Sequence, residues 1–193
     1  MTSIGMRGRS ARSGFTTMGA SIGMAALGIL ASLALPRIDQ PERQLATATR
    51  ASWAALTAAR QQAIRYGHDV RVEFDTAHAL ITIIHDEDGN GVRNGEERAT
   101  TRYLPREVVF GTVAAEAGAH AAPAVSFGAD GYGAPVLVFH ADGSASESGG
   151  IHLRTTRAAH AAWASEVRLL TVAQKDGRLV GMRLHDGVWQ RTF

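Results

Sequence analysis

The chain has no cysteine among its 193 residues. Disulfide bridges, a thiolate nucleophile and metal sites with cysteine ligands are therefore excluded. It also has no Walker A motif, and none of its eight histidines forms an H-x-x-x-H or H-E-x-x-H pair, which argues against nucleotide hydrolysis and a helical zinc site. The one G-x-S-x-G match, at residues 19–23, lies in an apolar segment with no strand before it. We expect a protein that is not an enzyme and has no cofactor, with one candidate calcium loop described below.

The sequence also has little net charge. Twenty Lys and Arg against eighteen Asp and Glu leave +2. Arg7, Arg9 and Arg12 lie within the first fourteen residues, which contain no acid, so removal of that stretch would cancel the excess. Too little positive charge then remains for a broad phosphate-binding surface, and nucleic acid is not an expected partner.

Charge is absent from residues 15–35, which as a helix would measure roughly 31 Å, about the thickness of a hydrocarbon core. The arginines before this segment predict a cytoplasmic N-terminus and place the following residues across the membrane, in the periplasm. We therefore expect a single-pass protein of the bacterial inner membrane, with membrane lipid as a partner. The alternative is a cleaved signal peptide, because the start is basic and Ser32-Leu33-Ala34 is a small-x-small triplet.

The start of the apolar segment reads Ser13-Gly14-Phe15-Thr16-Thr17. This junction resembles the class III leader of type IV pilins and pseudopilins. The resemblance implies that a prepilin peptidase cleaves after Gly14 and methylates the new N-terminal Phe15. The apolar helix would then serve as a membrane anchor and later as filament core. Pro36, the twenty-second residue of the mature chain, stands where pilin helices commonly carry a proline.

The fifth mature residue departs from that family. Pilins usually have Glu there, whereas this chain has Gly19 and no acid between residues 15 and 35. Such a carboxylate would pair with the N-terminal amine of a neighbouring subunit, so its absence bears on assembly. Gly19 and Gly23 form a G-x-x-x-G spacing that allows close helix packing in lipid. Small residues are also common throughout this chain, so the spacing has an alternative explanation in composition.

After Pro36, Asp39 and Glu42 with Pro41 between them predict the start of a helix that ends near Tyr66, with Gly67 as its stop. Its apolar residues recur at helical spacing, which predicts one face packed on a sheet. That face comprises Leu45, Ala48, Ser52, Leu56, Ala59, Ala63 and Tyr66, and Trp53 and Ile64 broaden it.

Beyond Gly67 the hydrophobic pattern alternates, as in half-buried strands. Asp-Gly pairs at 130–131, 142–143, 176–177 and 186–187 indicate turns. We expect a mostly antiparallel β domain packed on the helix. The predicted strands are residues 70–74, 79–85, 101–104, 107–113, 124–127, 135–141, 150–154, 166–173, 178–185 and 187–192.

Three short patterns in this half also resemble the GspH/FimT family of minor pseudopilins: the acidic turn 86–91, Val125-Ser126-Phe127 with Gly131, and the strand pair joined at 176–178. The resemblance implies an α+β, pilin-like fold whose long N-terminal helix spans the membrane with its first half. The expected divisions are a cytoplasmic leader at 1–14, a transmembrane helix at 15–36, an amphipathic stalk helix at 37–66 and a periplasmic β-rich domain at 67–193.

By the same resemblance, the chain would be a minor pseudopilin in the periplasmic pseudopilus of a type II secretion system. Its partners would be other pseudopilins, the prepilin peptidase and the inner-membrane assembly platform. One alternative is a FimT-like minor type IV pilin in pilus assembly or DNA uptake. Another is a signal-anchored or exported calcium-binding β domain.

Residues 86–97 match the calcium-loop pattern D-x-[DN]-x-[DN]-G-x5-E in full. Oxygen ligands for a hard cation would come from Asp86, Asp88, Asn90, the carbonyl of Val92, Asn94 and Glu97. Strands are predicted on both sides of this loop, where an EF-hand has helices. An ordinary hairpin turn uses the same residue types, and that alternative stays open.

Three arginines near the C-terminus, Arg178, Arg183 and Arg191, are the candidate DNA contacts for the type IV pilin alternative. We expect strand alternation to place them on one face.

Overall fold

The computed structural model describes residues 24–25, 40–95, 97–112, 123–131, 133–160 and 165–192. The chain divides into two units, Met1–Asp39 and Gln40–Phe193. Only residues 24–25 of the first unit are described, so the predicted residues Gly14, Phe15, Gly19, Gly23 and Pro36 lie outside the described part of the chain. Among the helices that the structure describes, none is both long and apolar enough to cross a membrane. The fold below is that of the second unit.

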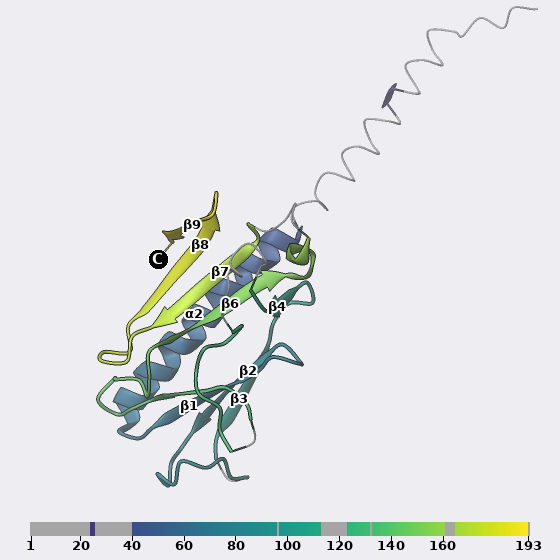
Figure 1. The fold of residues 1–193 in the computed structure, drawn as a ribbon. Coiled ribbons are helices and arrows are strands. Elements are labelled where there is room, and N and C mark those ends of the chain that lie inside the picture. Colours follow the sequence, from purple (N-terminus) through teal and green to yellow (C-terminus); the bar gives the residue numbers. More distant parts are fainter. Residues whose placement is uncertain are drawn as a thin grey trace, which may run out of the picture. The chain divides into compact units, whose positions relative to one another are not determined.

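The predicted helix is confirmed as α2, Gln40–Tyr66 (Figure 1). It ends at Gly67, whose φ of 72° is a left-handed conformation that glycine adopts without strain, and whose N–H donates to the Ala63 carbonyl. The narrow stripe of the predicted face is buried except for Tyr66, which is 48% exposed at the last turn. Of the two residues that broaden it, Trp53 is partly buried and Ile64 is 47% exposed. The buried residues of α2 are Leu45, Ala48, Thr49, Ser52, Ala55, Leu56, Ala59 and Ala63.

The first sheet has four strands in the order β3-β2-β1-β5, and every neighbouring pair is antiparallel. Its strands are β1 Val70–Asp75, β2 Leu80–His85, β3 Ala99–Tyr103 and β5 Val136–Phe139. Val70, Val72 and Phe74 are fully buried on one face of β1, as the alternating pattern predicts.

The second sheet has five antiparallel strands in the order β4-β6-β7-β8-β9. These are β4 Val108–Phe110, β6 Gly149–Thr155, β7 Val167–Val172, β8 Leu179–His185 and β9 Val188–Arg191. A short 3-10 helix, η1 Thr156–Ala159, follows β6.

One predicted strand is wrong. Residues 124–127 do not form an extended ladder and make only a single bridge, Val125 with Ile151 of β6. Phe127 instead turns into the core, where its ring stacks on Phe74 with 5.7 Å between centroids. Backbone hydrogen bonds from Ser126 to the Gly150 carbonyl and from His152 to the Ala124 carbonyl join the segment to β6, so it pairs with the sheet over only these few residues.

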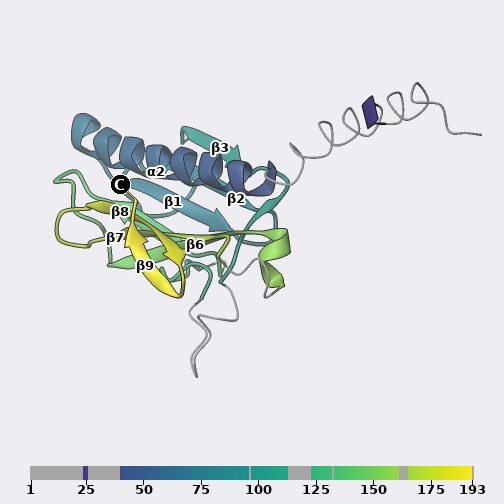
Figure 2. The same ribbon diagram turned by 90° about the horizontal axis from the view of Figure 1, so that it is seen from above.

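The main hydrophobic core joins α2 to both sheets (Figure 2). Leu56 of α2, Leu137 of β5 and Leu153 of β6 are each 0% exposed within this one cluster. A smaller cluster, Ala158, Val167 and Leu184 with Trp189 against them, lies under η1 and the β8–β9 hairpin. The expected α+β fold, with an N-terminal helix packed on antiparallel sheets, is confirmed.

Candidate functional site

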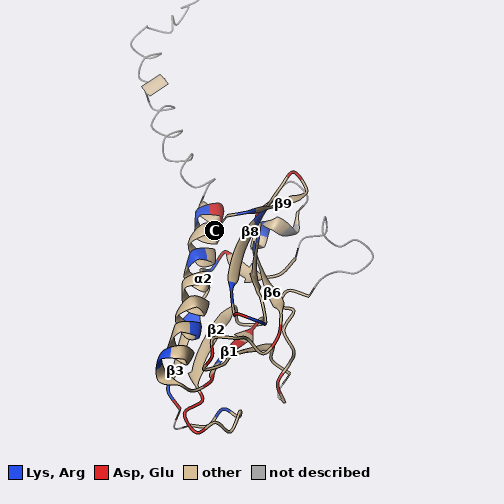
Figure 3. Ribbon diagram, turned by 90° about the vertical axis from the view of Figure 1, so that its left-hand side faces the viewer, with Lys and Arg blue, Asp and Glu red and all other residues tan. Residues whose placement is uncertain are grey.

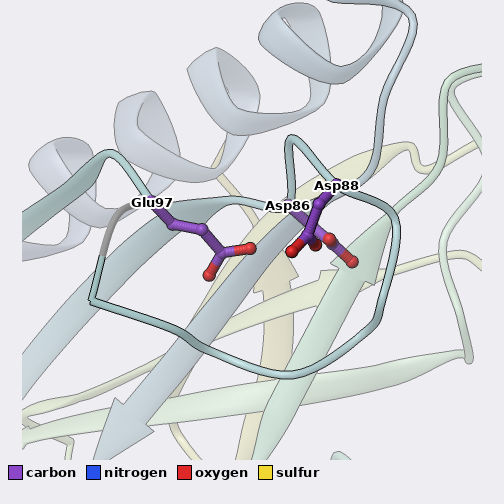
Figure 4. A group of neighbouring side chains, drawn as sticks. All are labelled: Asp86, Asp88 and Glu97. Atoms are coloured by element: carbon purple, nitrogen blue, oxygen red, sulfur yellow. The ribbon is translucent and has the colours of Figure 1, made fainter.

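The calcium-pattern loop connects β2 to β3, as predicted (Figure 4). Asp86 follows β2 directly and is 3% exposed. Its N–H donates to the carbonyl of Asp69, which lies shortly after the end of α2. Its two carboxylate oxygens accept the backbone N–H groups of Asn90, at 3.1 Å, and Gly91, at 2.9 Å. Gly89 and Gly91 have φ of 68° and 69°, so the loop turns inward where glycine allows it.

Three carboxylates of the loop converge. Asp86, Asp88 and Glu97 each bring one oxygen within 4.8 Å of the others. Glu97 reaches this point from the far end of the loop and accepts the N–H of Asn94 at 3.1 Å through one oxygen. Its other oxygen, Oε1, is inaccessible and has no hydrogen-bond partner among the described residues. Hard cations such as calcium favour this arrangement of carboxylate oxygens.

The other predicted ligands lie in the same loop, and the side chains of Asn90 and Asn94 form hydrogen bonds within it. The side-chain amide groups of Asn90 and Asn94 donate to Asp88 Oδ2 at 2.7 Å and 2.9 Å. Asn90 Oδ1 accepts the N–H of Val92 at 2.6 Å. Val92 is 54% exposed. The same hydrogen bonds would stabilise an ordinary hairpin connection, which needs no ion. The flanking elements are strands and not helices, which confirms that the loop is no EF-hand.

The sequence did not indicate Arg71, whose side chain contacts this loop. Arg71 lies on β1, on the face opposite Val70 and Val72, and is only 9% exposed. One end of its guanidinium donates to the carbonyl of Gly91, and the other lies 3.7 Å from Glu73 and 3.9 Å from Asp130. These groups, with Arg93 and Glu97, line a cleft of about 1050 Å³. Gly91 and Asp130 are twenty or more residues from Arg71 in sequence, so no local pattern shows these two contacts.

A ring cluster lies beside the loop, at the end of α2. Tyr66 stacks on His68 with 5.9 Å between centroids, and both contact His85 edge-on. The guanidinium of Arg98 lies over the Tyr66 ring and bonds Glu87 at 2.9 Å. Burial lowers the pKa of His85, and the charge of Arg98 lowers it further. The residue before Asp86 is therefore neutral near pH 7.

The three C-terminal arginines do not share a face. Arg183 of β8 lies opposite Gln190, whereas Arg191 of β9 lies opposite Met182. Residues directly opposite in a ladder point to the same side and successive residues to opposite sides, so Arg183 and Arg191 point to opposite faces of the hairpin. Arg178 lies in the turn before β8. The expectation of one face is wrong because the hairpin register pairs residues of different parity.

Arg183 has a neighbour that the sequence did not indicate. On its other side Arg183 lies opposite Arg168 of β7, whose guanidinium side chain is 12% exposed and 3.4 Å from Glu42 on the first turn of α2. Burial lowers the pKa of Arg168, and the charges of Glu42 and Arg183 act on it in opposite directions.

Comparison with protein families gives one match, to the family model described as Type II transport protein GspH, over residues 48–177. This range takes in most of α2, the whole of the first sheet and the second sheet as far as the β7–β8 turn. The chain belongs to the GspH family. Residues 15–36, β8 and β9 lie outside the matched range.

Two solved structures are similar to this GspH-family chain, and both are of the minor pseudopilin EpsH from the type II secretion system of Vibrio cholerae. The first is 16% identical with a TM-score of 0.49, covering 75% of this chain and 99% of the other. The second is 14% identical with a TM-score of 0.38, covering 78% and 94%. A comparison with curated proteins gave no match. The family assignment therefore rests on the family model.

Proposed function

We propose that this chain is a minor pseudopilin, a structural subunit of the pseudopilus of a type II secretion system. The observation that carries the proposal is the match to the GspH family model over residues 48–177. The fold is consistent with it, since one long helix, α2, packs on two antiparallel sheets. Its direct partners are other pseudopilins, and the chain has a structural role rather than an enzymatic one.

Loss of the gene in the source bacterium tests the secretion role. Proteins exported by the type II system are expected to accumulate in the periplasm, while type IV pili and DNA uptake stay unchanged. Complementation with the wild-type gene should restore secretion. Lost piliation or lost DNA uptake with normal secretion would contradict the proposal and favour the FimT-like minor pilin.

Membrane anchoring and maturation form the second part of the proposal. Residues 15–35 carry no charge and follow a basic leader that ends in Gly14. Prepilin peptidase would cleave between Gly14 and Phe15 and methylate Phe15. The inner-membrane platform would then assemble the chain, with the β domain in the periplasm. Gly19 in place of the usual Glu suggests a position in the filament where the N-terminal amine of a neighbour is neutralised in another way. Gly19 and Gly23 would allow close helix packing at that position.

Mass spectrometry of the chain expressed with and without a prepilin peptidase tests the maturation. The expected product begins with N-methylated Phe15 and appears only with the peptidase. Gly14→Ala should block cleavage, whereas Gly8→Ala in the same leader should not. A chain cut near residue 35, or a precursor that the peptidase leaves unchanged, would favour the exported β domain.

We also propose that the loop 86–97 binds calcium. The complete motif and the convergence of Asp86, Asp88 and Glu97 within 4.8 Å support this. Their negative charges repel one another at this spacing, and a divalent cation with oxygen ligands would relieve that repulsion. A saturating ion at a hundredfold excess over its Kd would stabilise the fold by about 3 kcal/mol.

Calorimetric titration of the detergent-solubilised chain with calcium tests this site. Asp88→Asn and Glu97→Gln should abolish the binding heat and the calcium-dependent rise in Tm. Glu87→Gln is the matched control, because Glu87 lies in the same loop but bonds Arg98 instead. If the wild-type chain gives no heat and no Tm shift, the loop is an ordinary hairpin connection.

A further inference from the structure

The β7–β8 hairpin runs along α2. Its contacts with the helix therefore show which parts of the second unit, Gln40–Phe193, lie at each end of that unit. At one end, Arg168 of β7 contacts Glu42 in the first turn of α2 at 3.4 Å. At the other end, the turn residue Gly177 approaches Arg60, in the second half of α2, so closely that an added Cβ would lie 2.8 Å from its Nε. The start of α2 therefore lies at the same end as the start of β7 and the end of β8. We call this the proximal end.

Three exposed arginines gather at the proximal end. Arg43 is on the first turn of α2, next to Glu42. Arg183 is the cross-strand neighbour of Arg168. Arg106 precedes β4, whose Val108 pairs with Thr155 at the end of β6. Among the described residues, no carboxylate lies within 4.0 Å of these three guanidinium groups. Arg43, Arg106 and Arg183 are called the proximal arginine surface below.

Two of the acids near this surface are paired with other arginines, and two keep their negative charge. Glu42 pairs with Arg168, and Glu166 pairs with Arg157. Glu107 accepts a hydrogen bond from Thr156 at 2.8 Å, and Asp186 lies 3.5 Å from His185.

Three arginines at the distal end of the unit are paired with acids instead. Arg71 lies between Glu73 and Asp130, Arg93 pairs with Glu73, and Arg98 pairs with Glu87. Figure 3 shows the acidic segments of these loops near the end of α2. Surface arginines paired with acids carry little net field, whereas the three arginines of the proximal arginine surface have no carboxylate within 4.0 Å and keep their full positive charge.

The length of the connecting chain indicates what lies near this surface. Four residues, 36–39, separate the last residue of the uncharged segment from Gln40. Fully extended, they reach at most about 18 Å. If residues 15–35 span the membrane, the proximal end stays within that distance of the bilayer surface, where anionic headgroups attract arginines over about a Debye length.

We propose that the proximal arginine surface, Arg43, Arg106 and Arg183, binds the anionic phospholipid headgroups of the membrane that anchors the chain. It rests on the anchoring part of the proposed function. The interaction holds the β domain against the membrane before assembly, and it must break when the subunit moves into a filament. Each arginine contributes to a shared electrostatic attraction, so the binding weakens with salt.

Fluorescence transfer in lipid nanodiscs tests this with the full chain. Since the chain has no cysteine, a single Ser165→Cys donor reports the proximal end, and Gln61→Cys on the second half of α2 is the distal reference. Acceptors are placed on headgroups of discs made of phosphatidylcholine alone or with phosphatidylglycerol. We expect greater transfer from position 165 in anionic discs, lost at high salt. Each charge removed should lower the docked-to-undocked ratio by about fivefold.

Arg183→Gln is the informative variant and Arg178→Gln is its matched control. Both arginines are exposed on the same hairpin and have no carboxylate partner among the described residues, but Arg178 is at the distal turn. Arg183→Gln should reduce the transfer in anionic discs, and Arg178→Gln should not. Equal transfer in the two lipids, or an equal loss with Arg178→Gln, would overturn the proposal.

Two further outcomes would contradict the proposal, one through the membrane anchor and the other through the ligand. A chain that does not co-purify with nanodiscs of either composition contradicts the anchor itself, and with it the geometry on which the proposal rests. The other outcome is that a short DNA duplex binds the wild-type chain in neutral discs but not the Arg183→Gln variant, while anionic lipid has no effect on transfer. In that case the surface binds nucleic acid and the lipid proposal is wrong.

Discussion

Glu166 is a buried acid just before β7, and at the residue scale its environment determines how the fold responds to pH. Burial by itself raises the pKa of Glu166, but hydrogen bonds from Arg157 and Thr155 and the charge of Arg157 outweigh it, so the pKa is lowered. The Thr155 hydroxyl donates to Glu166 at 2.6 Å and Arg157 Nε donates at 2.8 Å. A carboxyl with a lowered pKa stabilises the fold above its unfolded-state pKa, and this is lost as pH falls through its folded-state pKa.

We predict that Glu166→Gln lowers the free energy of unfolding at pH 7 by about 1–3 kcal/mol, because Arg157 loses its buried charge partner. The same variant should show a shallower loss of stability as pH falls below about 5, where glutamates begin to be protonated. Urea unfolding at several pH values measures both effects. Glu107→Gln is the control for the same chemical change, and an unaltered pH slope in Glu166→Gln would contradict the assignment.

At the element scale, two Asp-Gly turns are alike in sequence and different in surroundings. Gly177 in the β7–β8 turn has φ of 59°, and a Cβ there would lie 2.4 Å from the Gly143 carbonyl oxygen. Gly187 in the β8–β9 turn has φ of 74°, and a Cβ there would meet no atom of the described residues within 4 Å. Of these two turns, the β7–β8 turn packs closely against the loop at Gly143.

We predict that Gly187→Ala costs about 1 kcal/mol, the strain of a left-handed alanine. Gly177→Ala should cost clearly more, because the turn must also move away from Gly143 and Arg60. Urea midpoints of the two variants give the comparison. Equal losses would mean that the β7–β8 turn does not pack on the loop at Gly143.

For the whole molecule, one shared core predicts one unfolding transition. Leu56, Leu137 and Leu153 come from α2, the first sheet and the second sheet, and they lie in the same cluster. Leu→Ala at each position should lower the free energy of unfolding by about 2–5 kcal/mol and shift a single transition. Far-UV circular dichroism and tryptophan fluorescence should agree, with exposed Gln61→Ala near wild type. Two separate midpoints would contradict a common core.

Local patterns predicted much of this architecture because their causes are local. The helix stop at Gly67 follows from backbone freedom, and alternation in β1 follows from the pleat. Tyr66 was placed in the apolar face because of its spacing, but the helix ends there and its ring meets His68 and His85 instead. The segment at 124–127 was predicted as a strand, but it makes a single bridge to β6, and Phe127 turns into the core against Phe74.

The sequence by itself determined the uncharged N-terminal segment, the order of helix and strands, and the spacing of the 86–97 loop. These depend on neighbours along the chain. Tertiary structure decided that Glu97 lies close to Asp86 and Asp88, and that Arg71 bonds the loop through the carbonyl of Gly91. It also placed Arg183 opposite Arg168, which contacts Glu42, and pointed Arg191 to the other face of the hairpin. Such contacts join residues up to 126 positions apart, and their geometry depends on strand register and packing that no local pattern contains.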